Sequence, residues 1–174
     1  MAVLLGLALA APVRAQEEAE PASLGAVPAR IDIPTIGTHA EIVPLGLEDD
    51  GATMAAPADP DTVGWFELGP GVGGRGNMLL DGHVDWAGRP RVFGRLEALN
   101  PGDEIRITAT NGVEKAYAVT WVKLYPADIA PLDEIFTTAP DEQITLITCG
   151  GAFDQAARMY VSRWVVRAAP LSAN

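Results

Sequence analysis

The sequence is poor in the residues that form disulfides and structural metal sites. It contains one cysteine and two histidines among 174 residues. A single cysteine cannot form an intramolecular disulfide, and with two histidines it cannot complete a four-ligand structural zinc site without several carboxylates. Cys149 is therefore either a packing residue or a reactive thiol. Composition alone favours packing, because free cysteines are among the most buried residues in proteins.

Basic residues are also scarce. Twelve lysines and arginines stand against 23 aspartates and glutamates, which gives a formal net charge of −11. A surface of this charge repels phosphate backbones and offers no basic stripe, so we expect no nucleic-acid partner. The acidic balance indicates little else, because many soluble proteins carry such a charge merely to remain soluble.

The N-terminal apolar run is short. Residues 2–12 are uncharged and mostly apolar, whereas a membrane-spanning helix needs about 20 such residues. Small residues around Ala15 match a signal-peptidase site, although the usual positive n-region is missing. We predict that residues 1–15 are a signal peptide or a truncated signal anchor, with a buried N-terminal segment as the alternative. The protein is then extracytoplasmic, either membrane-anchored through its N-terminus or secreted.

The remainder divides into a linker and one domain. Residues 16–28 are predicted to be a flexible linker, because the stretch up to residue 26 is rich in Glu, Ala, Pro and Ser and has no apolar periodicity. Residues 29–170 have the length of a single folded domain.

Glycine and proline are abundant, and the apolar pattern is that of strands. The 18 glycines and 14 prolines indicate many turns. Alternating stretches predict strands at residues 29–34, 41–45, 77–81, 103–110, 113–122, 143–149 and 160–168. Asn111-Gly112 predicts a hairpin with a type I′ turn, and single helical turns are expected within 91–99 and 132–136, after prolines. The expected fold is all-β, a closed barrel with short helices packed on it.

Cys149 ends one of these apolar strands and is followed by two glycines, at which we expect the strand to stop. A cysteine in this position can present its sulfur to a cleft, and the glycines allow a substrate backbone to approach closely. The Gly150 N–H is placed to serve an oxyanion. The alternative is a core cysteine that closes the strand.

Two further residues could complete such a site. His83 follows an apolar strand and a glycine, and its imidazole suits proton transfer near neutral pH; the alternative is a surface histidine bonded to Asp85. Arg163 lies on the strand after Cys149 and could stabilise an oxyanion, although a strand arginine is more often a solvated surface residue. Arg158 is the competing candidate. His39 lacks such a setting and is expected to be an ordinary surface residue.

These motifs together resemble the sortases. The string from Thr145 to Cys149 matches the TLxTC nucleophile motif of that family, and the residues after it are similar to the class F branch. Asp81 departs from the pattern, because the family more often has a small residue there, and we expect it to perturb the histidine. The other matching blocks follow in family order over about residues 29–168: Ile33-Pro34-x-Ile36-Gly37, Val63-Gly64-Trp65-Phe66, Gly82-His83-Val84-Asp85 and Pro101-Gly102-Asp103.

The resemblance implies a sortase-type barrel of about eight strands and a cysteine transpeptidase that needs no cofactor. Cys149 would be the nucleophile, His83 the acid/base and Arg163 the electrostatic stabiliser. The implied substrate is an LPxTG-like sorting signal on a surface protein, which is joined through a thioacyl intermediate to an amine acceptor such as a cell-wall precursor or a pilin lysine. A Cys-dependent hydrolytic peptidase and a non-catalytic binding barrel are the rival hypotheses.

Overall fold

A computed structural model describes residues 24–137 and 140–171. The predicted signal segment lies outside the described residues, as does most of the predicted linker. The strands are β1 Pro28–Ile33, β2 Thr38–Leu45, β3 Val63–Phe66, β4 Asn77–Asp81, β5 Asp85–Trp86, β6 Arg89–Pro90, β7 Glu104–Ala109, β8 Glu114–Pro126, β9 Gln143–Asp154 and β10 Met159–Pro170. The helices are η1 Pro34–Ile36, η2 Leu96–Ala98 and α1 Leu132–Ile135.

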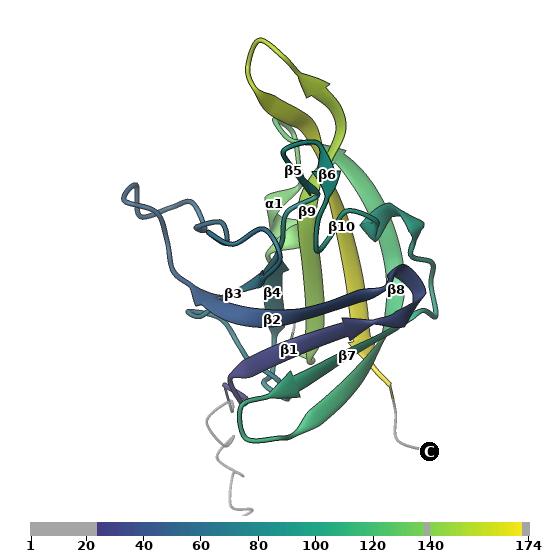
Figure 1. Cartoon of the computed structure of the whole chain (residues 1–174). Coiled ribbons are helices and arrows are strands. Elements are labelled where there is room, and N and C mark those ends of the chain that lie inside the picture. The colour runs from purple at the N-terminus through teal and green to yellow at the C-terminus, as the bar shows by residue number, and fades with distance from the viewer. Residues whose placement is uncertain (1–23, 138–139, 172–174) are drawn as a thin grey trace, which may run out of the picture.

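Eight of these strands close into a barrel in the order β1-β2-β3-β4-β9-β10-β8-β7 (Figure 1). The pairs β2–β3 and β4–β9 are parallel, and the other neighbours are antiparallel. Strands β5 and β6 form a separate two-stranded sheet. The predicted all-β barrel with short helices is thus confirmed.

Strand alternation assigns one set of side chains to the core and the other to the outer face of the barrel. On β9, Ile144 and Leu146 are fully buried in the core cluster, so Thr145, Ile147 and Cys149 point outward. On β4 the same reasoning turns Leu79 and Asp81 outward. This outer face of β4 and β9 carries the candidate site.

The hairpin between β7 and β8 forms as predicted, but its turn does not. Gly112 has a φ of +83°, whereas Asn111 is absent from the residues with positive φ, so the turn cannot be type I′. The Gly112 N–H instead bonds the Ala109 carbonyl, and the Asn111 side chain accepts from the Val113 N–H. This turn needs a positive φ at Gly112 alone. A type I′ turn would need a positive φ at both central residues.

Strand β9 does not stop at its glycines, contrary to expectation. It continues to Asp154 and forms with β10 a hairpin that rises beyond the barrel (Figure 1). The pairing gains one extra β9 residue beyond Gly150, where Gly151 takes a φ of +74°. The glycines therefore make a bulge, a feature common beside active sites.

Short elements were the least predictable. Strands β3, β5 and β6 were not expected, and the helical turn predicted within 91–99 is limited to the 3-10 turn η2. The turn predicted at 132–136 is confirmed by α1. None of the helices in the described residues has the length and apolarity that crossing a membrane requires.

Candidate active site

The three predicted site residues meet at one rim of the barrel. Strand β4 leads into His83, β9 carries Cys149, and β10 returns beside β9 so that Arg163 is the register partner of Cys149. All three line one pocket of about 230 Å³. Its other lining residues are Val84, Asp85, Phe153, Arg158, Met159 and Tyr160.

Cys149 is half-buried and has a raised pKa. Burial is the main cause, because it disfavours the charged thiolate. The positive charge of Arg163 lowers the pKa, while the carboxylates of Asp81 and Asp85 raise it. The next residue has to be glycine, since a Cβ on Gly150 would lie 2.5 Å from Cδ1 of Trp164.

The backbone that leads into His83 is held by two hydrogen bonds of Gly82, the residue before it. The Gly82 N–H donates to the Ile147 carbonyl at 3.2 Å, and Thr148 Oγ1 donates to the Gly82 carbonyl at 2.6 Å. These two bonds attach the segment before His83 to β9. Gly82 leaves room for Phe93, because a Cβ there would lie 2.7 Å from the Phe93 ring.

The imidazole of His83 has two further neighbours. Its Nε2 lies 2.8 Å from the carbonyl oxygen of Pro57. The ring of Trp86 packs edge-on against it, with 5.1 Å between centroids and an interplanar angle of 73°. The ring is therefore oriented by groups outside the pocket as well as by its own backbone.

Arg163 is half-buried and fixed by backbone carbonyls. Its Nη1 donates to the Tyr160 carbonyl at 3.1 Å and to the Ser162 carbonyl at 2.8 Å. Arg158 lines the same pocket from the hairpin, with a φ of +54°, but its charge is not among the causes of the pKa shift of Cys149. Electrostatic proximity to the thiol therefore favours Arg163 over Arg158.

Asp81, the residue that the sequence led us to expect would perturb the histidine, interacts electrostatically with His83 and Arg163. Burial raises its pKa from its ordinary value of 3.8 to about 6, and the positive charges of His83 and Arg163 and a hydrogen bond from the Gly82 N–H oppose the rise. The signal in the sequence was its departure from the small residue that the family more often has before Gly-His. Asp81 thus adds a titratable charge that interacts with both the histidine and the arginine.

A second, apolar pocket of about 250 Å³ includes Leu79 of β4. Leu79 is the register partner of Thr145, four residues before Cys149. Its lining residues are Leu47, Ala52, Met54, Phe66, Leu79, Leu132 and Phe136. Leu132 belongs to α1, and α1 is tied to the barrel by hydrogen bonds to its backbone: Asn77 Nδ2 donates to the Ile135 carbonyl at 2.9 Å, and Arg167 Nη2 donates to the Glu134 carbonyl at 2.6 Å. Within residues 24–137 and 140–171, no three His, Cys, Asp or Glu side chains gather as a metal site requires.

The domain as a whole is similar to known proteins. The family model described as "Sortase domain" matches residues 31–171, and no curated protein matches the chain. Among solved structures, a lid mutant of sortase A from Corynebacterium diphtheriae is 28% identical, with a TM-score of 0.64 over 85% of this chain and 72% of that one.

Two further structures are similar. A sortase D5 transpeptidase from Clostridium perfringens is 26% identical, with a TM-score of 0.61 over 84% of this chain and 79% of that one. Sortase C-1 from Actinomyces oris is 22% identical, with a TM-score of 0.64 over 83% of this chain and 72% of that one, and at that identity it supports the fold alone. The similarity to class F stays a prediction.

Proposed function

Because the chain belongs to the sortase family, we propose that this cysteine transpeptidase cleaves the Thr-Gly bond of an LPxTG-like sorting signal and joins the new carboxyl end to an amine on the cell surface. The observation that carries the proposal is the meeting of Cys149, His83 and Arg163 in one pocket. A nucleophile, a proton carrier and a fixed positive charge are the groups that acyl transfer through a thioester needs.

In the first half of the reaction the Cys149 thiolate attacks the threonine carbonyl carbon. The carbonyl electrons move to oxygen, and the Arg163 guanidinium stabilises the resulting oxyanion. The Gly150 N–H is a candidate second donor. His83 gives its proton to the glycine nitrogen as the C–N bond breaks, so a neutral amine leaves and a thioacyl enzyme remains.

In the second half an amine resolves the thioacyl enzyme. The neutral His83 accepts a proton from the attacking amine, the new amide bond forms, and the Cys149 thiolate departs. The proposed acceptors are a cell-wall precursor peptide or a pilin lysine. An enzyme acting on such substrates works outside the cytoplasm, so we place it at the cell surface, anchored or secreted.

The apolar pocket supports a sorting signal with a leucine. Leu79 pairs in register with Thr145, four residues before Cys149 on β9, which corresponds to roughly 13 Å along the strand. In an extended LPxTG segment the leucine precedes the threonine by three residues, or roughly 10 Å. A leucine side chain in this pocket would thus leave the threonine carbonyl near the thiol.

The test is product analysis with peptides. An Abz-Leu-Pro-Glu-Thr-Gly-Dnp peptide is incubated with the full chain, with and without triglycine as the amine, and the products are identified by mass spectrometry. We expect the threonine-triglycine ligation product and a thioacyl adduct on Cys149 under acid quench. Cys149→Ala is the matched control and should give neither.

Two outcomes would reject the proposal in favour of its rivals. Equal amounts of free threonine acid with and without triglycine would identify a hydrolytic peptidase. Slow alkylation of Cys149 by iodoacetamide, together with no cleavage of any peptide in an LPxTG-type library, would identify a binding barrel whose cysteine only packs.

A further inference from the structure

The contact between His83 and Pro57 determines which ring nitrogen carries a proton. A proline carbonyl can only accept a hydrogen bond, so Nε2 of His83, 2.8 Å away, has to be the donor. Nε2 is then protonated both in the neutral ring and in the imidazolium. Nδ1 has no hydrogen-bond partner in the part of the chain that the structure describes, so it is the nitrogen free to gain and lose a proton.

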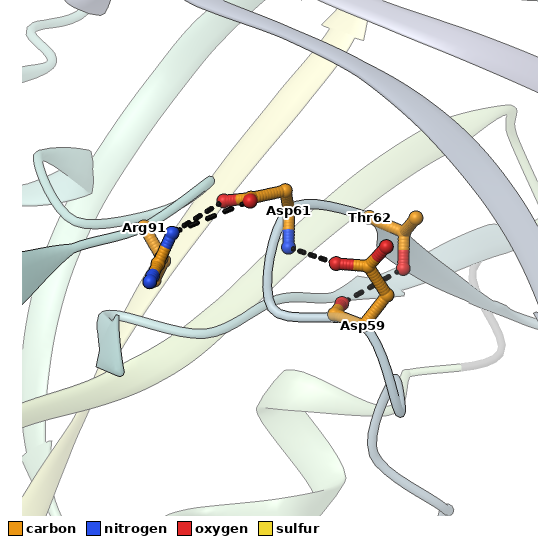
Figure 2. A network of polar contacts seen from close by, with 4 residues as sticks. All are labelled: Asp59, Asp61, Thr62 and Arg91. Carbon is orange, nitrogen blue, oxygen red and sulfur yellow. Dashed lines mark hydrogen bonds and ion pairs between the residues drawn. The ribbon is translucent and has the colours of Figure 1, made fainter. Parts of the chain in front are cut away.

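Pro57 is buried and lies just before a short turn. Hydrogen bonds among the residues of that turn hold its shape (Figure 2). The Asp59 carboxylate accepts from the Asp61 N–H at 2.9 Å, and Thr62 Oγ1 donates to the Asp59 carbonyl at 2.9 Å. Such Asx-type bonds stiffen a turn locally. They fix the shape of residues 59–62, which begin two residues after Pro57, but do not attach the turn to the segment that carries His83.

That attachment comes from Arg91. Figure 2 shows its guanidinium reaching the Asp61 carboxylate, with Nη1 at 3.2 Å and 3.3 Å from the two oxygens. The backbone of the same segment follows that of the histidine: the Arg91 N–H donates to the Val84 carbonyl, and the Phe93 N–H donates to the His83 carbonyl, each at 3.0 Å. Arg91 is thus joined to His83 on one side and to the Pro57 turn on the other.

We propose that the Asp61–Arg91 ion pair is a positioning clamp, which holds the Pro57 carbonyl against Nε2 of His83 and so assigns proton transfer to Nδ1. The assignment of proton transfer to Nδ1 rests on the proposed function of His83. The geometry of the clamp is independent of that function, because Asp61 and Arg91 lie outside the pocket.

The first test observes the ring protons directly. The full chain is labelled with ¹⁵N-histidine, and proton–nitrogen spectra are recorded on the neutral rings, with His39→Gln to assign the two histidines. We expect a protected N–H on Nε2 of His83 and an unprotonated Nδ1. His39, whose side chain is 67% exposed and whose Nδ1 contacts the Asp32 carboxylate, is the exposed reference for Nε2.

The second test removes the clamp. Asp61→Ala and Arg91→Met should each speed exchange of the Nε2 proton with water by about fivefold and lower kcat by about fivefold, because a partly exposed ion pair contributes modestly and small misplacements of a catalytic group slow the reaction. KM should stay within about twofold, since neither residue faces the apolar pocket. The double variant should be no worse than either single one, because both remove one interaction.

The matched control is the Glu104–Arg106 ion pair on β7, whose side chains are 38% and 46% exposed and do not line the pocket. Glu104→Ala should change neither proton exchange nor kcat. The proposal is overturned if neutral His83 carries its proton on Nδ1, or if Asp61→Ala behaves like Glu104→Ala. Full activity in His83→Gln would reject the proposed role of His83 instead, and the exchange measurements would still test the clamp.

Discussion

Replacing Asp81 by asparagine should make the Cys149 thiol more acidic. The side chain keeps its size and loses a negative charge that disfavours the thiolate. Asp81 is the register partner of Ile147, and Cys149 lies two residues further along β9 on the same face. With about 4.8 Å between strands and about 3.3 Å per residue, the two Cα atoms are roughly 8 Å apart.

The size of the effect follows from this separation. Two unit charges about 8 Å apart interact by roughly 2 kcal/mol at an effective dielectric constant of about 20. Cys149 is half-buried, so solvent screens part of this interaction. We expect the pKa of Cys149 to be lower in Asp81→Asn, because a charge that raises it is removed.

The assay is the rate of alkylation by iodoacetamide as a function of pH, because only the thiolate reacts. The chain has a single cysteine, so total modification reports Cys149 alone. The midpoint should move to lower pH in Asp81→Asn. It should move less in Asp85→Asn, since the charge of Asp85 contributes less to the pKa shift of Cys149 than that of Asp81.

A third variant is the control. Asp128→Asn removes a carboxylate that does not line the catalytic pocket and is not among the causes of the shift. Its profile should match the wild type. An unchanged midpoint in Asp81→Asn, or a move to higher pH, would refute the electrostatic reasoning.

Three other predictions concern the catalytic candidates and Asp81. Arg163→Ala should lower the acylation rate by roughly 10²–10³-fold, and Arg163→Lys should restore only part of it. Arg158→Ala should change the rate little. Stopped-flow peptide cleavage measures these rates, and a larger loss in Arg158→Ala than in Arg163→Ala would make Arg158 the stabiliser. Cys149→Ala should abolish peptide cleavage and Cys149→Ser nearly so; retained cleavage would remove the thiol from the chemistry. The pKa of Asp81 is about 6 in the folded state, against an ordinary value of 3.8, so the folded state binds this proton more tightly than the unfolded state does. The free energy of unfolding should therefore fall by up to about 3 kcal/mol as pH rises from about 4 to about 6. Urea unfolding should show that Asp81→Asn lacks this loss, and parallel stability curves would contradict it.

The fold was largely predictable because strands have a local signature. The apolar stretches at 77–81 and 143–149 predicted strands, and the structure has β4 and β9 there. The turn at Asn111-Gly112 was located correctly but given the wrong type, because the Asn111 side chain closes it by accepting from Val113. The end of β9 was misjudged, because a bulge at Gly151 keeps two strands paired where a glycine pair usually ends them.

The site was predictable in its motif residues and not in their supports. Cys149 and His83 lie in strings with a chemical meaning, so the sequence marked them as candidates, and the structure brings them into one pocket. The Pro57 carbonyl is a backbone group, and no sequence pattern marks a carbonyl as a ligand of a side chain 26 residues away. The ion pair between Asp61 and Arg91 has no sequence signature either. It joins two loops, and their approach depends on how the barrel closes.

The arrangement of the strands explains why three distant residues meet. β4 and β9 are parallel, so the residues that follow β4 and those late in β9 arrive at the same rim, and β10 turns back antiparallel to bring Arg163 opposite Cys149. A hairpin alone could supply the cysteine and the arginine but not the histidine, because a parallel neighbour has to come from a segment elsewhere in the chain. The His83–Cys149 spacing therefore depends on the β4–β9 pairing, whereas the Arg163–Cys149 spacing depends on a local hairpin. Weakening the β4–β9 pairing should separate the imidazole from the thiol while the charge of Arg163 continues to act on Cys149.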